Sequence, residues 1–265
     1  MTDWLPEAAR YAARWLDHQM RVTEQPGCVL AVARGDTLLL EHAVGQADLE
    51  GGTALTPEHR FRVASHSKTF TAAAVMLLRE RGLLSLDDAI GRHVVGLSAA
   101  TGAVTVSQLL SHSAGLMRDG TDSGHWQDRQ PFLDEAALRA QLAEPLPVEA
   151  NSRFKYSNLG FGLLGLAIES ITGEAYAGWM MREVVGPAGL AATTPDLPAA
   201  PGAPLATGHG TRLPFGRRLP VPGHNPTHAL AAATGFVSTA GDLARFIASL
   251  DPAAASSILS VASRR

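Results

Sequence analysis

The chain has 265 residues, 46% of them hydrophobic and 18% charged, a composition typical of a globular protein with an ample core. Its net charge of −3 shows no basic field, which argues against nucleic acid as a partner. The single cysteine, Cys28, excludes an intramolecular disulfide, and no apolar run reaches the length of a membrane span. The first residues lack the basic and apolar regions of a signal peptide, so we expect a cytoplasmic protein without a membrane partner.

The beginning of the chain has the pattern of a helix followed by a hairpin. Apolar residues recur at helical spacing over residues 6–21, which predicts an amphipathic helix. Two short apolar runs, at 28–33 and 37–44, flank a turn and predict two antiparallel strands. A polar, glycine-rich stretch at 45–57 predicts a loop.

The rest of the chain predicts mainly helices. Thr105 and Gln108 have the spacing of a capping box, and three glycines within 159–172 predict a closely packed, buried helix. Residues 187–226 are rich in Pro, Gly and Ala and predict little regular structure. Helices are expected at 65–82, from 85, from 105, at 133–142, 159–172, 174–185 and 239–250, with one more beginning within 251–265.

Ser65 and Lys68 form a Ser-x-x-Lys motif at the start of the helix that ends near Gly82. A serine there lies where backbone N–H groups are unsatisfied and the helix dipole is positive. Lys68 lies one turn further on the same face, with its Cβ roughly 5–6 Å from that of Ser65. A nucleophilic hydroxyl needs a base within reach, and burial of the ammonium would lower its pKa toward that of a working base.

The spacing alone does not identify a nucleophile. The chain contains two lysines, and each follows a serine by three residues, because Ser152 and Lys155 repeat the motif. The alternative interpretation of Ser65 is an ordinary helix cap, and that of Lys68 is a solvated residue of the first turn.

Tyr156 and Asn158 form a second polar group, in a loop before the glycine-rich helix. A phenol near a lysine can exchange protons with a serine and with a leaving group. An amide can accept a bond from a lysine and donate one to a substrate carbonyl. The alternatives are a tyrosine on the surface of a loop and an asparagine that caps the next helix.

In their order along the chain, these motifs resemble the serine β-lactamase and penicillin-binding-protein superfamily. The similar branch is that of class C β-lactamase-related hydrolases and esterases. Ser65 to Lys68 and Tyr156 to Asn158 match its two motifs, and Ser152 falls in the loop before its tyrosine, so Ser65 is the predicted nucleophile. Further stretches similar to the family are 61–65, 82–88, 105–116, 154–173, 187–190 and 235–243.

The resemblance implies an α+β fold of the β-lactamase/transpeptidase type, with an antiparallel sheet lobe and an all-helical lobe. On this basis residues 1–265 form one domain, with a sheet lobe at about 1–62 and 230–265 and a helical lobe at about 63–229. It also implies that Ser65 forms an acyl-enzyme, that Lys68 and Tyr156 share the proton transfers, and that Asn158 binds substrate. The expected partner is a small-molecule acyl substrate, with no cofactor and no metal.

The chain departs from the family in one respect. The third family motif, Lys-Thr-Gly or His-x-Gly on a sheet strand, is not found after the segment at 235–243. We therefore expect a C-terminally truncated member with an incomplete sheet and an exposed strand edge. Two functions remain open. One is a serine hydrolase that acts on an ester, a β-lactam or a D-amino-acid peptide, and the other is an inactive member or binding scaffold.

Overall fold

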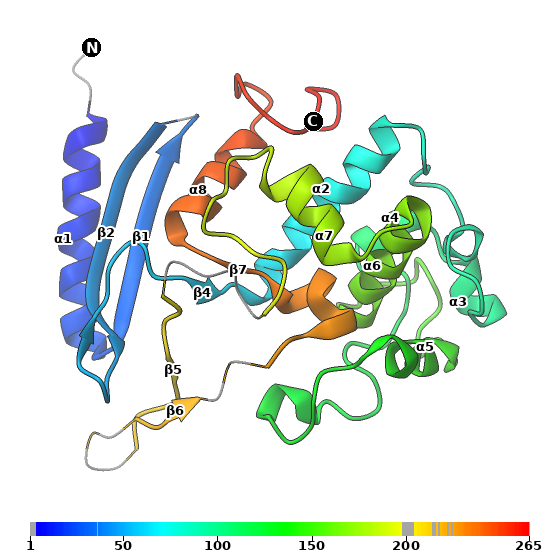
Figure 1. Ribbon diagram of the computed structural model, residues 1–265, viewed down its shortest axis with the longest axis horizontal. Coiled ribbons are helices and arrows are strands. Elements are labelled where there is room, and N and C mark those ends of the chain that lie inside the picture. Colours follow the sequence, from blue (N-terminus) through cyan, green and yellow to red (C-terminus); the bar gives the residue numbers. More distant parts are fainter. Residues whose placement is uncertain are drawn as a thin grey trace.

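A computed structural model describes residues 4–35, 37–197, 204–213, 216, 218–221, 223 and 225–264. Helix α1 (Leu5–Thr23) precedes an antiparallel hairpin of β1 (Gly27–Arg34) and β2 (Thr37–Asp48). Helix α1 packs on one face of this hairpin, and α8 (Ala240–Ser249) packs on the other (Figure 1). The predicted N-terminal helix and hairpin are confirmed.

The segment predicted as a loop at 45–57 is partly a strand. Strand β2 continues to Asp48, and β3 (Thr53–Ala54) pairs with its end, which gives the order β1-β2-β3. The turn at Gly52, where φ is +62°, reverses the chain tightly enough for this pairing. Gly51 and Gly52 therefore lie in a hairpin turn, while Gly45 belongs to β2.

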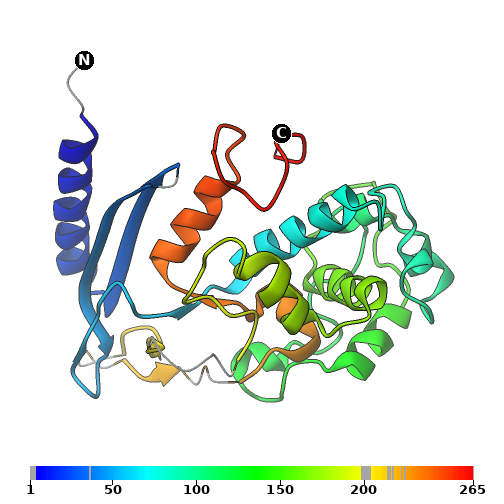
Figure 2. The same cartoon turned by 45° about the horizontal axis from the view of Figure 1, so that its top comes forward.

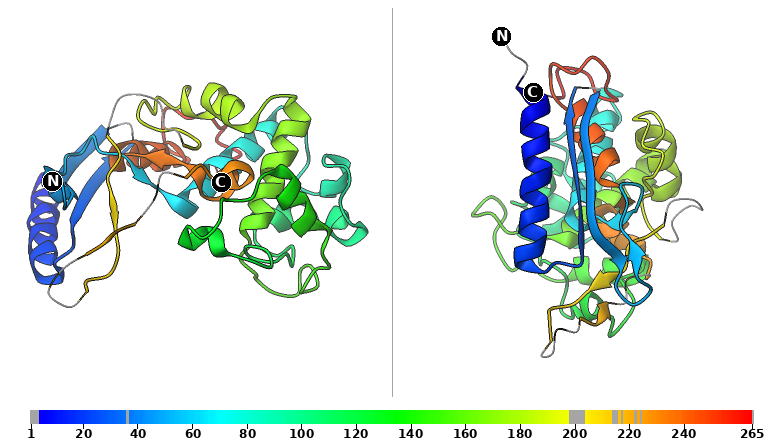
Figure 3. Two further views of the ribbon diagram at one scale, coloured as in Figure 1. Left: turned by 60° about the horizontal axis from the view of Figure 1, so that its bottom comes forward. Right: turned by 90° about the vertical axis from the view of Figure 1, so that its left-hand side faces the viewer.

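Helices α2 to α7 gather at the end of the molecule away from α1 and the hairpin, as the further views show (Figures 2 and 3). Two π-helical turns, Met181–Val185 and Ala231–Gly235, interrupt the pattern, so the helix predicted at 174–185 is α-helical only in its first part. The capping box of Thr105 and Gln108 is confirmed. The helices are α2 (Ser67–Glu80), α3 (Ala99–Ala103), α4 (Val106–Leu110), α5 (Glu135–Ala143), α6 (Asn158–Thr172) and α7 (Tyr176–Met180).

The helix predicted within 251–265 is wrong, because the described part of this segment folds into turns. Leu259 is buried, and Ser260 donates from its amide and its hydroxyl to Glu80 at the end of α2. The guanidinium of Arg264 donates to the carbonyls of Ser249 and Asp251 after α8. These contacts attach the segment to the ends of α2 and α8.

Two pairs of very short strands complete the structure. Strand β4 (Phe61–Arg62) pairs with β7 (Val237–Ser238) immediately before the first turn of the α2 region. Strands β5 (Gly208–His209) and β6 (Pro220–Val221) are the only strands in the described part of 187–226, as its composition predicted.

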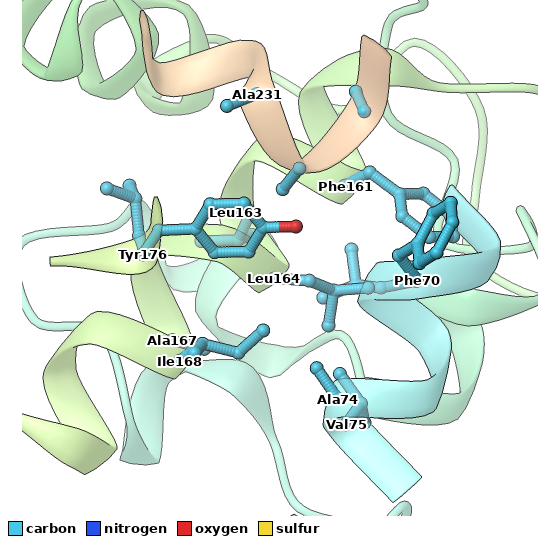
Figure 4. Close-up of a cluster of buried hydrophobic side chains, with 14 of the residues drawn as sticks. Phe70, Ala74, Val75, Phe161, Leu163, Leu164, Ala167, Ile168, Tyr176 and Ala231 are labelled. Carbon is cyan, nitrogen blue, oxygen red and sulfur yellow. The ribbon is translucent and has the colours of Figure 1, made fainter. Parts of the chain in front are cut away.

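The core lies where α2, α6 and the turn Ala231–Gly235 meet (Figure 4). Phe70 is fully buried between Phe236 and Phe246, with ring centroids 4.4 and 4.2 Å away. Gly165 lets the turn approach α6, because a Cβ there would lie 3.0 Å from the Cβ of Ala232. The prediction of a closely packed, glycine-rich helix is thus confirmed.

Strand β1 lies at the edge of its sheet, and among the described residues only β2 pairs with it. The expected exposed edge is therefore confirmed for the part of the chain that the structure describes. The two lobe boundaries stay a prediction. None of the described helices combines the length and the apolar composition that crossing a bilayer requires.

Candidate active site

Ser65 lies in a 3-10 turn (Ala64–His66) between β4 and α2, with its side chain exposed. The preceding residue, Ala64, has a φ of +47°, a conformation that costs a non-glycine residue free energy. Ser67 holds this turn, since its hydroxyl donates to the Ala64 carbonyl at 2.5 Å and accepts from the Phe236 amide at 3.0 Å. The expected helix start is thus a strained turn tied to the segment after 231–235.

Tyr156 is the direct partner of Ser65. The Ser65 Oγ and the phenolic oxygen of Tyr156 are 2.5 Å apart, although 91 residues separate them in the chain. The Tyr156 ring packs on the His112 ring, with centroids 4.4 Å apart. His112 also accepts from the Ser157 amide through Nδ1 at 3.1 Å, which fixes the loop that carries Tyr156.

Burial and the nearby charge of Lys68 lower the pKa of His112 to about 4. Its imidazole is therefore neutral near pH 7 and keeps Nδ1 free of a proton for the Ser157 amide. His112 has a φ of +57°, so a strained backbone again supports the site.

Lys68 is buried, with 7% of its surface exposed. Its ammonium donates to Asn158 Oδ1 at 2.6 Å and to the Ala233 carbonyl at 2.8 Å, and it lies 4.7 Å from the centroid of the Tyr156 ring. Desolvation lowers the pKa of Lys68 to about 8, while the carboxylate of Asp119 partly opposes this shift. The predicted burial of this ammonium is confirmed.

Asn158 connects Lys68 to a carboxylate that the sequence did not reveal. It is buried, and its amide nitrogen donates to Asp119 Oδ1 at 2.5 Å. Asp119 in turn pairs with Arg118, whose Nε lies 3.1 Å from Asp119 Oδ2. The chain Lys68–Asn158–Asp119 orients the amide so that its oxygen faces the ammonium.

The alternative role of Asn158 as a helix cap is wrong. Ser157 is the N-cap of α6, and its hydroxyl accepts from the Gly160 amide at 2.9 Å. Asn158 is the first residue of the helix, so its side chain is free to bind Lys68.

The second Ser-x-x-Lys motif has a different environment. Ser152 is exposed, and its hydroxyl donates to the carbonyl of Glu149 in the same loop at 2.6 Å. Of the two serines, Ser65 is the one whose hydroxyl contacts the Tyr156 hydroxyl, and its role as the nucleophile stays a prediction.

The described histidines do not form part of a metal-binding cluster. Among the described residues, no group of three or more His, Cys, Asp and Glu side chains could hold a metal ion. His209 accepts from the Leu49 amide, and the backbone amide of His228 donates to Asp196. His224 lies outside the described residues.

Known proteins resemble this chain in sequence and in structure. Protein flp of Staphylococcus aureus (strain MW2) is 25% identical over 183 residues, 68% of this chain and 36% of that protein. Penicillin-binding protein 4* of Bacillus subtilis (strain 168) is 32% identical over 167 residues, 62% of this chain and 36% of that protein. The chain thus spans about a third of the length of these two relatives.

A solved structure supports the fold. The octameric penicillin-binding protein homologue from Pyrococcus abyssi superposes with a TM-score of 0.79 at 24% identity, over 100% of this chain and 59% of that one. The fold is therefore of the β-lactamase/transpeptidase type, as the resemblance implied. The family model described as Beta-lactamase matches residues 12–264, so the chain belongs to the beta-lactamase family within the serine β-lactamase and penicillin-binding-protein superfamily.

Proposed function

We propose that the protein is a serine hydrolase that forms an acyl-enzyme on Ser65. The observation that carries the proposal is the 2.5 Å contact between Ser65 Oγ and the Tyr156 hydroxyl, with a buried ammonium beside the same ring. A nucleophile in contact with a group that can take its proton is the arrangement that acyl transfer requires. The substrate is an ester, a β-lactam or a D-amino-acid peptide, classes that the family suggests.

In the first step, the Ser65 oxygen bonds to the acyl carbon while its proton passes to the oxygen of Tyr156. Lys68 and Tyr156 act together as one base. The pair can accept the proton of Ser65 only after either the ammonium or the phenol has lost a proton. The pair returns that proton to the leaving group when the bond to the acyl carbon breaks. Water then attacks the acyl-enzyme and releases the acid, with the same pair as base.

Lys68 and Tyr156 contact different groups in the site. Lys68 donates to Asn158 and Ala233, while the oxygen that touches Ser65 belongs to Tyr156. We therefore place Tyr156 as the group that exchanges the proton with Ser65, and Lys68 as the neighbour that stabilises negative charge on the phenol. Asn158 accepts a hydrogen bond from Lys68 through its amide oxygen, and its amide nitrogen donates to Asp119, which fixes the orientation of the amide.

The test is covalent labelling of the intact chain with a fluorophosphonate and with a penicillin, followed by mass spectrometry of the adduct. We expect one adduct, on Ser65, which Ser65→Ala removes. Ser152→Ala is the matched control, since it changes the other Ser-x-x-Lys motif and should label at the wild-type rate. Tyr156→Phe should slow labelling by about 10²–10⁴-fold, the range of general base catalysis.

The outcome that contradicts the proposal is a folded protein that gives no adduct on Ser65 with either reagent. That result would favour the second candidate, an inactive member that keeps the site as a binding scaffold. The open edge of β1, which lies on the sheet side of the molecule, is the observation behind this candidate.

A further inference from the structure

A cavity of about 310 Å³ begins beside the proposed nucleophile. It is lined by Ala64, which directly precedes Ser65, and by Thr234, which follows the carbonyl that binds Lys68. Arg62 and Phe61 of strand β4 form part of its wall. A group held in this cavity would belong to a molecule whose reacting atom lies at Ser65.

Aromatic side chains also line the cavity. Trp126 and Phe132 meet edge to face, with ring centroids 5.2 Å apart. The guanidinium of Arg62 lies 5.9 Å from the centroid of the Phe132 ring, and its Nη1 is fixed by the carbonyls of Gly223 and Asn225. Aromatic rings and a guanidinium in one lining favour a flat, aromatic ligand group over a flexible aliphatic one.

His125 is one of the polar residues that line the cavity. It is 1% exposed, yet neither ring nitrogen has a hydrogen bond among the described residues. Its ring packs against Phe132, at 4.9 Å between centroids, and against Trp126, at 5.2 Å. Burial lowers the pKa of His125, although Asp119 and Asp122 oppose this, so the ring is neutral and holds one donor and one acceptor.

Buried polar atoms in native proteins almost always have partners, so an unpaired imidazole in a cavity wall calls for an explanation. An imidazole that served only to fill space would be better replaced by a phenyl ring, which leaves no polar atom unpaired. Because neither nitrogen reaches solvent, a ligand gains access only when a neighbouring side chain turns. Trp126 packs on the His125 ring and is 41% exposed, so it is the side chain that we expect to turn.

We propose that this cavity selects the substrate, and that it takes an aromatic ring with a hydroxyl substituent that pairs with His125. The proposal rests on the proposed function for the position of the reacting carbonyl, but the cavity and the unpaired ring are independent of it. Trp126 and Phe132 hold the ring, and His125 gives or accepts the hydrogen bond. The aromatic group can stand in the acyl part or in the leaving group of the substrate.

Binding is measured first, without catalysis, on the Ser65→Ala chain by calorimetry. The probes are 4-hydroxyphenylacetamide and phenylacetamide, which differ by one hydroxyl. We expect the hydroxylated probe to bind about tenfold more tightly, since an unpaired buried group gains a partner. The added substitution His125→Phe should remove this difference and raise the Tm, because it deletes two unpaired polar atoms.

His18→Phe is the matched control, because His18 is an exposed histidine on α1. It should leave the tenfold difference intact. Equal binding of the two probes to the Ser65→Ala chain would overturn the proposal. The proposal would also be overturned if the His125→Phe variant kept the difference in affinity between the two probes and had an unchanged Tm.

Ester hydrolysis by the chain that keeps Ser65 then shows whether the ring belongs to the acyl part or to the leaving group of the substrate. Ethyl 4-hydroxyphenylacetate carries the ring in its acyl part, and 4-hydroxyphenyl acetate carries it in its leaving group. His125→Phe should lower kcat/KM about tenfold for the one ester whose ring enters the cavity, and it should leave ethyl acetate unaffected. If the probes bind as expected but no ester is cleaved, the cavity assignment stands and the proposed function fails.

Discussion

The helical region and the sheet of this protein differ in how completely they are packed. Phe70 of α2 is fully buried between two phenylalanine rings, and it belongs to the cluster of buried side chains drawn in Figure 4. Strand β1, in contrast, is only half-buried over most of its length, and α1 beside it exposes Tyr11 and Trp15. One edge of β1 has no strand partner among the described residues.

Two of the predicted site residues belong to the closely packed helical region. Lys68 and Asn158 stand on α2 and α6, the two helices that contribute most to the packed core, and both side chains are buried. Close packing fixes rotamers, which a site with contacts of 2.5–2.8 Å requires. The sheet supplies none of the four predicted site residues.

The largest effect should come from the packed region. Phe70→Ala removes a ring that stacks on Phe236 and Phe246, and we expect it to lower the free energy of unfolding by about 3–5 kcal/mol. Phe154→Ala is the matched control, since Phe154 is 69% exposed and its loss should change stability by no more than about 0.5 kcal/mol. Urea unfolding at constant pH measures both. Similar losses in the two variants would erase the proposed difference between buried and exposed regions.

The second effect tests the burial of Lys68 through pH. The pKa of Lys68 is about 8 in the folded chain and 10.5 in the unfolded chain, so between these values the unfolded state binds more protons. Stability from this group therefore rises as the pH increases from 8 to 10.5. Relative to Lys68→Met, which has no charge to lose, the wild type should gain up to about 3 kcal/mol over this range.

The measurement is urea unfolding of both chains at several pH values, with Lys155→Met to correct for the loss of one lysine. The rate of Ser65 labelling should rise through about pH 8, since the Lys68–Tyr156 pair must first lose one proton. A labelling rate that stays flat from pH 7 to 9, together with parallel stability curves, would show that Lys68 is not desolvated.

The predicted nucleophile and its partners lie in local motifs. Ser65, Lys68, Tyr156 and Asn158 occupy two short segments, and the family resemblance of these segments selected Ser65 over Ser152. The structure adds the contact between Ser65 and Tyr156, which the sequence could suggest only through the resemblance.

The residues that orient the site were not predictable in the same way. Asp119 and the Ala233 carbonyl reach Asn158 and Lys68 across 39 and 165 residues, and neither has a local signature. A carbonyl is present in every residue, so only the fold selects the one at Ala233. His112 lay within a stretch already similar to the family, but its role as an acceptor for the Ser157 amide depends on tertiary packing.

The smallest effect concerns the open edge and changes no side chain. The Gln46 amide donates a hydrogen bond to the Pro26 carbonyl, and this bond determines which residues of β1 are hydrogen-bonded to β2. In an antiparallel pair the amides alternate, so those of Cys28 and Leu30 point at β2 and those of Val29 and Ala31 point away from it. Apolar residues of α2 and α8 border a cavity of about 380 Å³ along this outer edge.

Native-state hydrogen exchange resolves the two sets of amides. We expect the outward amides of Val29 and Ala31 to exchange without measurable protection, while that of Leu30 exchanges only when the hairpin opens. The matched reference is Leu30 itself, because the three residues are adjacent, equally half-buried and in one strand. Protection of Val29 and Ala31 equal to that of Leu30 at low protein concentration would mean that the edge has a partner. Protection that grows with concentration would identify that partner as a second copy of the chain, since an unpaired edge is a template for pairing.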